Sequence, residues 1–245
     1  MARSDITPYL SVVIPIFNER DNLHPLTAQT LKALNGQVPS FEIIYVDDGS
    51  MDGSSSLLDQ LAGNHPEVRV VHFNHNCGQT AAFDAGFRHA RGELIATLDG
   101  DLQFDPADIL QLLPLAARYD LVCGWRRDRH DTLIKRLSSR IANVVRNAVT
   151  ADGVRDTGCS LKVFRRAVVE RLALFEGMHR FFPALARMHG FSLVEVPVHH
   201  YPRAHGQSKY GIGNRLFKGL YDLIAVGWMQ KRCLRYRYRE RDERD

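Results

Sequence analysis

The sequence predicts an α/β protein, built on a mainly parallel sheet with helices on both of its faces. Two observations lead to this prediction. Short apolar runs alternate with segments of helical spacing through the first half of the chain, and such alternation is typical of βαβ units. Several apolar runs also end in polar or acidic residues. In sheets of this class, ligands bind beyond the carboxyl ends of the strands.

The expected elements follow one another in a regular order. Leu10–Ile14 is an apolar run that Pro15 should end, and leucines at helical spacing follow from Asn22 to Leu34, just before Gly36. Proline and glycine at these places are ordinary stop signals. The other elements expected in this half are strands at Ile43–Val46, Val68–Phe73 and Glu93–Leu98, and helices at Ser54–Leu61 and Gln79–Ala90.

The composition is that of a globular protein with a sizeable core. The chain has 245 residues, of which 44% are hydrophobic and 24% are charged, and its formal net charge is +4. We expect one domain over residues 1–230 and a basic, flexible tail over residues 231–245. The four cysteines are far apart, which favours reduced thiols over a disulfide framework or a zinc site. Because we find neither a signal-peptide core nor a membrane-spanning apolar run, we expect a cytoplasmic chain.

The segment that follows the expected strand Glu93–Leu98 carries two aspartates. Asp99 and Asp101 lie two positions apart, so in extended chain their side chains point the same way. Like charges at that separation repel unless a proton or a cation lies between them. Carboxylate oxygens suit Mg²⁺ or Mn²⁺, and Gln103 would add a neutral oxygen. The alternative is that Asp99 caps a turn and Asp101 is solvated.

Acidic segments end three of the expected strands: Pro15–Glu19, Asp47–Ser50 and Asp99–Asp101. Because the carboxyl ends of parallel strands meet at one edge, we expect these segments to share one site. Taken singly, they could instead be helix caps and a tight turn. No dinucleotide fingerprint or phosphate loop follows a strand. A nucleotide would therefore be held by acids, backbone and metal, as expected of a nucleotide-sugar site.

Six spaced motifs carry a resemblance to a known family: VVIPIFNE (12–19), VDDGS (46–50), GQTAA (78–82), DGDLQ (99–103), DTGCSLK (156–162) and RAHGQSKY (203–210). Together they resemble the family 2 glycosyltransferases, most closely the branch of dolichyl-phosphate mannosyltransferase and bacterial undecaprenyl-phosphate glycosyltransferases. The resemblance covers roughly residues 10 to 228. It implies a GT-A type, Rossmann-like fold, a nucleotide-diphosphate sugar donor, a divalent metal and inversion at the sugar carbon.

The resemblance also implies roles for particular residues. The metal positions are Asp99, Asp101 and Gln103, and the catalytic set is Asp99, Asp101 and Arg126. The nucleotide-sugar positions are Pro15, Phe17, Glu19, Val46, Asp48, Asp99, Gly100, Arg126, Arg203 and Lys209. Arg203 and Lys209 belong to a loop expected to close over the diphosphate. The family binds the acceptor phosphate near Lys135, Arg136, Ser139 and Arg140. Two positions depart from the family pattern, because Phe17 replaces a frequent tyrosine and Trp125 replaces a small residue.

A phosphate acceptor would change what the site needs for catalysis. The second pKa of a phosphate monoester is about 6, so at pH 7 it is already mostly dianionic. Such an acceptor needs cations to place it and no base to activate it. The stretch from Arg126 to Arg146 holds seven Lys or Arg against two Asp, which fits this need, although it could be a solvated basic face. Asp156 would be a base only with a hydroxyl acceptor, and a structural role in its turn is the alternative.

The C-terminal segment Ile212–Met229 has apolar residues at helical spacing, with a basic stretch beyond it. It predicts either an interfacial helix on an anionic membrane surface or an amphipathic helix packed on the protein. Many bacterial relatives continue here into transmembrane helices, and we find no such apolar run in this sequence. The resemblance therefore implies peripheral attachment to the inner face of the cytoplasmic membrane, or a separate transmembrane partner. Nucleic acid is not an expected partner, because no binding motif accompanies the basic tail.

The resemblance thus implies transfer of a sugar, such as mannose or glucose, from a nucleotide-diphosphate sugar to a polyprenyl phosphate. An alternative is a related enzyme that acts on a hydroxyl acceptor in cell-envelope polysaccharide synthesis. A third reading is an inactive relative that serves as a binding subunit, and the intact Asp99, Asp101 and Gln103 speak against it.

Overall fold

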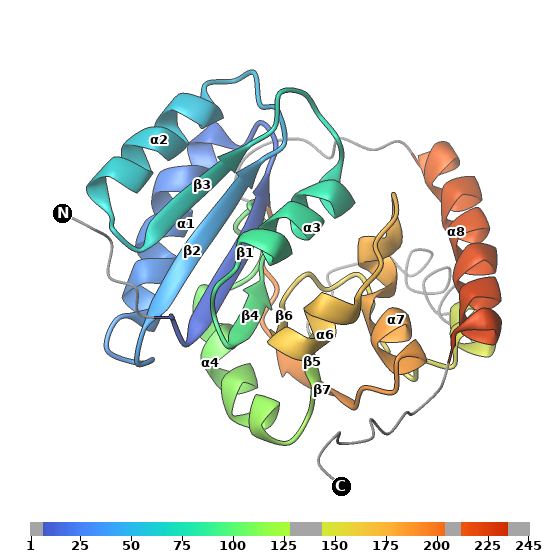
Figure 1. Cartoon of the computed structure of the whole chain (residues 1–245). Coiled ribbons are helices and arrows are strands. Elements are labelled where there is room, and N and C mark those ends of the chain that lie inside the picture. The colour runs from blue at the N-terminus through green and yellow to red at the C-terminus, as the bar shows by residue number, and fades with distance from the viewer. Residues whose placement is uncertain (1–6, 128–143, 204–211, 235–245) are drawn as a thin grey trace, which may run out of the picture.

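The computed structural model describes residues 7–127, 144–203 and 212–234 of the chain. Within these residues a seven-stranded sheet forms the centre, with strand order β3-β2-β1-β4-β6-β5-β7 (Figure 1). The strands are β1 (Leu10–Ile16), β2 (Phe41–Asp47), β3 (Val68–His72), β4 (Leu94–Thr97), β5 (Leu121–Arg126), β6 (Lys162–Arg165) and β7 (Leu193–Val198). Strand β6 is antiparallel to β4 and β5, and the other pairs are parallel. The predicted α/β class and mainly parallel sheet are confirmed.

Helices cover both faces of this sheet (Figure 1). The helices α1 (Arg20–Leu34), α2 (Ser54–Asn64) and α4 (Ile109–Leu112) contribute to the core on one face. The helices α3 (Gln79–His89), α6 (Arg166–Arg171) and α7 (Phe182–Met188) contribute to the core on the other face. Consecutive residues of β1 belong to opposite cores, since Val12 packs on the first and Val13 on the second. This is the period of two expected of a strand covered on both sides.

Strand β1 does not end at Pro15 as the sequence predicted. It continues to Ile16, and Pro15 lies opposite Val46 of β2. On its other side, β1 pairs with β4 only as far as Val13. The amide hydrogen that Pro15 lacks therefore falls beyond the end of β4, where no ladder bond is lost. Pro15 therefore does not interrupt β1, and the polar residues that follow β1 lie level with those at the end of β2.

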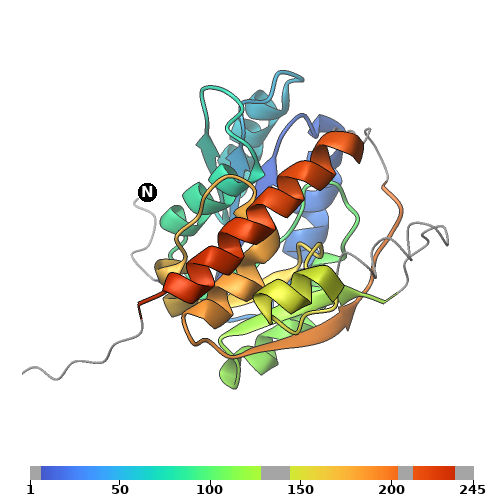
Figure 2. The same cartoon turned by 90° about the vertical axis from the view of Figure 1, so that its right-hand side faces the viewer.

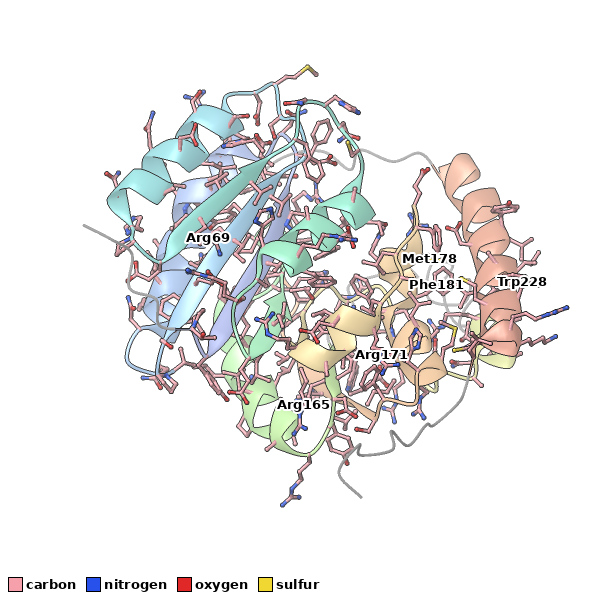
Figure 3. The ribbon with its side chains drawn as sticks, viewed as in Figure 1. Arg69, Arg165, Arg171, Met178, Phe181 and Trp228 are labelled. Atoms are coloured by element: carbon pink, nitrogen blue, oxygen red, sulfur yellow. The ribbon has the colours of Figure 1, made fainter. Side chains whose placement is uncertain are left out.

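The C-terminal helix α8 (Ile212–Arg232) lies across α7 and away from the central sheet (Figures 1 and 2). Its buried residues Leu223 and Val226 join a separate apolar cluster with Met178, Phe181 and Leu185. Trp228 points away from this cluster, while Met178 and Phe181 lie beneath the helix (Figure 3). Of the two predicted placements, packing on the protein is thus present on one face of α8, and the opposite face is exposed.

The outer face of α8 carries large apolar side chains in contact with solvent. Leu220, Tyr221, Ile224 and Trp228 are between 51% and 76% exposed. None of the helices described is long and apolar enough to cross a membrane. The expected domain boundary after residue 230 falls within the last turn of α8, and the expected tail from residue 235 lies outside the described residues.

Candidate active site

The structure brings together the exits of β1, β2 and β4. The register pairs Ile16 with Asp47, and the backbone amide of Asp48 donates to the carbonyl of Ile16 at 2.8 Å. The exit of β4 packs directly against that of β1, because a Cβ on Gly100 would lie 2.5 Å from the Ile16 side chain. A side chain at residue 100 would therefore force the Ile16 side chain to shift. The three acidic segments share one edge of the sheet, as parallel strands predict.

Hydrogen bonds between the β1 and β2 exits fix the backbone around Glu19. The amide of Asn18 donates to Ser50 Oγ at 2.9 Å, and the amide of Met51 donates back to Asn18 Oδ1 at 2.7 Å. Asn18 has a φ of 52°, a left-handed conformation that asparagine tolerates better than most residues. The amide of Glu19 donates to Ser54 Oγ at 3.2 Å. Glu19 is thus presented at the edge of the sheet.

A cavity of about 500 Å³ opens between the β1 and β2 exits and the loop after β3. Its lining consists of Phe17, Asp47, Gly49, Ser50, Met51, Ser55, Asp59 and the segment from His72 to Asn76. Phe17, a predicted nucleotide position, is therefore in contact with the cavity. Asp99 and Asp101 are not among the lining residues. The cavity and the acid pair are separate parts of the same edge.

Asp48 and Val46, two further predicted nucleotide positions, have buried side chains. The Asp48 carboxylate is buried and accepts bonds from the amides of Cys77 at 2.6 Å and Gly78 at 2.9 Å, and from Asn76 Nδ2 at 2.9 Å. It holds the loop that leads into α3. Val46 has no exposed surface and packs in the core, so its side chain does not reach a ligand. Only the backbone of Val46 can face a ligand.

Asp99 is held in an acidic environment at the exit of β4. Gln79 Nε2, at the start of α3, donates to Asp99 Oδ1 at 2.9 Å. Burial, followed by the charge of Asp101, raises the pKa of Asp99 to about 6, although Lys162 and Arg126 act in the opposite direction. Two carboxylates this close in sequence, one of them with a raised pKa, are suited to share a cation.

Asp101 has a cationic partner from the far end of the chain. Its Oδ2 accepts a bond from Arg203 Nη2 at 2.7 Å, and its Oδ1 accepts one from the amide of Gln103 at 3.2 Å. Arg203 Nη1 also lies 3.9 Å from Glu19 Oε1. The guanidinium thus bridges the exits of β1 and β4. The predicted loop arginine is at the acids, and the next part of that loop, including Lys209, lies outside the described residues.

The donor set fits a hard divalent cation that a diphosphate completes. Among the described residues no group of three or more His, Cys, Asp and Glu has the geometry of a closed metal site. Mg²⁺, however, typically takes one or two carboxylates plus substrate phosphates. Asp99 and Asp101 would supply the carboxylates. Gln103 donates its amide nitrogen to the carbonyl of Tyr201 at 3.3 Å, so its Oε1 is the atom with ligand chemistry.

Arg126, at the end of β5, is held by the carboxylate of Asp156, a residue for which the sequence offered two alternative roles. Arg126 Nε and Nη2 donate to Asp156 Oδ2 and Oδ1 at 2.7 Å and 2.8 Å.

A buried cation that sequence reasoning missed, Lys162, donates to the carbonyl of Cys159, and its charge also lowers the pKa of Asp99. The signal available for Lys162 was its place at the end of the DTGCSLK motif, where the short strand β6 begins. The expected acceptor residues Lys135, Arg136, Ser139 and Arg140 lie outside the described residues.

Comparison with known proteins gives a consistent set of matches in sequence. The profile of the family described as Glycosyl transferase family 2 matches residues 11–173. A dodecaprenyl-phosphate galacturonate synthase of Rhizobium johnstonii is 40% identical over 223 residues, covering 89% of this chain and 66% of the relative. An undecaprenyl-phosphate 4-deoxy-4-formamido-L-arabinose transferase of Edwardsiella ictaluri is 39% identical over 220 residues, with coverages of 89% and 67%. The chain spans about two thirds of the length of these relatives.

Solved structures share the fold at low sequence identity. Glucosyl-3-phosphoglycerate synthase of Mycobacterium tuberculosis, in complex with Mn²⁺, UDP and glucosyl-3-phosphoglycerate, matches with a TM-score of 0.66 and 17% identity, covering 91% of this chain and 80% of that one. The mannosyltransferase PcManGT of Pyrobaculum calidifontis, in complex with GDP-Man and Mn²⁺, matches with a TM-score of 0.62 and 19% identity, with coverages of 95% and 66%. Both similarities concern the fold.

Proposed function

We propose that this chain, which belongs to glycosyl transferase family 2, transfers a sugar from a nucleotide-diphosphate donor to a polyprenyl phosphate. The family is the one that the sequence motifs predicted. Both relatives named above are, by their names, transferases or synthases of polyprenyl-phosphate sugars. Those names support a lipid phosphate acceptor over the hydroxyl acceptor that the sequence left as the alternative.

The observation that carries the proposal is the pair Asp99 and Asp101 at the exit of β4, with two guanidinium groups nearby. Arg203 contacts Asp101 directly, and the charge of Arg126 acts on Asp99. A departing nucleoside diphosphate is strongly anionic, and fixed cations around it lower the barrier to its release. When bound by the two aspartates, Mg²⁺ or Mn²⁺ would add Lewis-acid stabilisation of the same leaving group.

The nucleoside would occupy the cavity beside Phe17 and the β2 exit, and its diphosphate would extend from there toward the aspartates. Arg203 contacts Asp101 and lies 3.9 Å from Glu19, so it links the acid pair to the exit of β1. Attack on the sugar carbon from the side opposite the diphosphate would invert its configuration. Because the acceptor phosphate is already ionised at neutral pH, the arginines position it and no base is needed. Lys135, Arg136, Ser139 and Arg140 remain the expected acceptor residues.

We further propose that the exposed face of α8 rests on the inner face of the cytoplasmic membrane, where a polyprenyl phosphate presents its headgroup. The face is formed by Leu220, Tyr221, Ile224 and Trp228. Val144, Val145 and Val149 on the neighbouring helical segment extend it, since Val149 lies against Gly227 of α8. The exposed Lys231 and Arg232 end the helix, and such cations favour anionic lipid headgroups. A separate transmembrane partner would strengthen the same attachment.

Product partitioning tests the proposed acceptor. The protein is incubated with radioactive nucleotide sugars, one at a time, with undecaprenyl phosphate in detergent and with Mg²⁺ or Mn²⁺. Label that enters the organic phase is the expected result, and it also identifies the sugar and the base. Label transferred to an added saccharide and retained in the aqueous phase would favour the hydroxyl acceptor instead.

A further inference from the structure

We propose that Asp156 is a positioning residue that fixes the guanidinium of Arg126 beside the aspartates of the β4 exit, and that it is not a general base. The inference rests on the proposed function, because Arg126 is taken to face the phosphates of that reaction. It assigns a task to a carboxylate for which the sequence offered two roles.

The contact between the two residues has the geometry of a clamp. Both carboxylate oxygens of Asp156 accept a bond from the guanidinium, at 2.7 Å and 2.8 Å, and Oδ2 also accepts the backbone amide of Arg126 at 3.2 Å. Side-chain exposure is 19% for Arg126 and 9% for Asp156. A bidentate pair of this kind fixes the plane of the guanidinium as well as its position.

The same contacts make Asp156 unsuitable as a base. A general base needs an oxygen within hydrogen-bond reach of the proton that it removes. Here each oxygen is already engaged with the guanidinium of Arg126. A reaction that required protonation of Asp156 would first have to break this pair.

The turn that carries Asp156 is itself anchored from two sides. Glu195 Oε1, on β7, accepts the amides of Arg155 and Asp156 at 2.9 Å and 3.3 Å. On the other side, Arg146 donates to Thr157 Oγ1 at 2.8 Å and to the carbonyl of Val154. The position of the carboxylate is therefore set by the surrounding framework, and the carboxylate in turn sets the position of Arg126.

Gly158 provides a second, independent indication. A Cβ at this residue would lie 3.0 Å from Arg126 Nη2 and 3.5 Å from Asp156 Oδ1. The backbone of the turn thus passes so close to the clamp that a methyl group would press on the guanidinium. Gly158→Ala therefore requires the Arg126 guanidinium to shift by a few tenths of an ångström, without removing any charge or hydrogen-bonding group.

A double-mutant cycle tests the inference. Transfer to the lipid acceptor is measured for wild type, Asp156→Asn, Arg126→Ala and the double variant. If Asp156 acts through Arg126, Asp156→Asn lowers kcat/KM about 10- to 100-fold, as loss of a supporting partner does, and the double variant is no slower than Arg126→Ala alone. If the loss of kcat/KM in the double variant equals the product of the losses in Asp156→Asn and Arg126→Ala, the inference is overturned.

The pH profile separates positioning from proton transfer. The acid side of the kcat/KM profile of Asp156→Asn should follow that of wild type, because the acceptor phosphate titrates in both. Loss of an acid limb in the variant would identify Asp156 as the base and overturn the inference. Gly158→Ala should lower kcat while leaving the melting temperature unchanged. Wild-type turnover in that variant would also contradict the inference, even if Asp156→Asn fails to fold.

Asp120→Asn is the matched control. Asp120 lies at the opposite end of β5, and its carboxylate also holds a neighbouring segment, through the amide and hydroxyl of Ser192 at 2.8 Å and 2.6 Å. Its kcat/KM should equal that of wild type. Failure of the proposed function would appear in the wild-type protein, as label that never enters the lipid. The double-mutant cycle is then measured with the acceptor that does take label, so failure of the proposed function and failure of the inference about Asp156 are distinguishable.

Discussion

Arg203 Nη2 lies 2.7 Å from Asp101 Oδ2, so a guanidinium neutralises one of the two acids at the exit of β4. Its other terminal nitrogen lies 3.9 Å from Glu19. A divalent cation bound by Asp99 and Asp101 would compete with Arg203 for the same carboxylate. A diphosphate would resolve this competition, because it offers the guanidinium a new anionic partner. Donor and cation should therefore bind with positive coupling.

Removal of Arg203 should raise the affinity of the acid pair for a divalent metal. In the absence of donor, Arg203→Ala is expected to bind Mn²⁺ about 3- to 10-fold more tightly, because the competing charge at a partly exposed pair is lost. The free Mn²⁺ is measured by electron paramagnetic resonance. Arg88→Ala, which breaks an exposed pair with Asp84, is the control. Unchanged or weaker Mn²⁺ binding by Arg203→Ala would contradict the competition.

Loss of the Asp101 carboxylate should abolish transfer. Asp101→Ala removes half of the acid pair, and the lost stabilisation of the leaving diphosphate should cost several kcal/mol, or at least about 100-fold in kcat. The initial rate of transfer from the labelled donor is the measurement. Asp105→Ala, which removes a carboxylate that caps a short helical turn in the same segment, should retain its activity. Near-normal turnover of Asp101→Ala would refute the assigned role.

Glu42 should make folding stability depend on pH. Burial alone would raise the pKa of Glu42, but bonds from Arg69, Arg91 and Ser11 outweigh it and hold the pKa below its usual value. A lowered pKa gives stability that is present above the usual value of about 4.3 and is lost as the pH falls below it. Glu42→Gln should therefore lower the free energy of unfolding by about 1 to 3 kcal/mol at pH 7.

The difference in unfolding free energy between wild type and Glu42→Gln should shrink toward pH 3, where the wild-type Glu42 carboxylate also becomes protonated. Urea unfolding at pH 7 and pH 3, followed by circular dichroism, measures it. Asp84→Asn, at an exposed ion pair on α3, should change the unfolding free energy little at either pH. A Glu42→Gln penalty that is the same at both values would show that the carboxylate charge is not the cause.

The exposed face of α8 should determine binding to lipid. Ile224→Asp and Trp228→Asp each replace an exposed apolar side chain, and each should weaken binding to vesicles containing anionic lipid by about 1 to 3 kcal/mol. Co-sedimentation at varied lipid concentration gives this value. The melting temperature should stay unchanged, because both residues are exposed. Met51→Asp, on the β2–α2 loop and also exposed, should bind vesicles like wild type. Equal binding by all variants would exclude this face.

The first half of the fold could be predicted because its signals are local. Each strand of this half is a short apolar run, each helix has its own spacing, and the acidic exits follow from parallel strand order. The second half gave weaker signals, because β6 inserts antiparallel between β4 and β5, which precede it in the chain. No periodicity in a single segment encodes such an insertion, and only the resemblance covered this region.

The contacts within the site could not be predicted, because they join residues far apart in sequence. Arg203 and Asp101 are separated by 102 positions, and Arg126 and Asp156 by 30. A sequence pattern gives the charges but not their partners. Val46 shows the reverse limit. It belongs to a motif, yet its side chain is completely buried in the core that α3 forms on this face of the sheet.

The bond between Asp101 and Arg203 also has a consequence for biosynthesis. Strands β1 to β4 are complete once residue 97 has left the ribosome, whereas β7 and Arg203 emerge about 100 residues later. A nascent chain would thus carry its acids uncompensated until translation is nearly over. Shortened products that stop before β7 would retain much of the sheet yet lack the charge that balances Asp101.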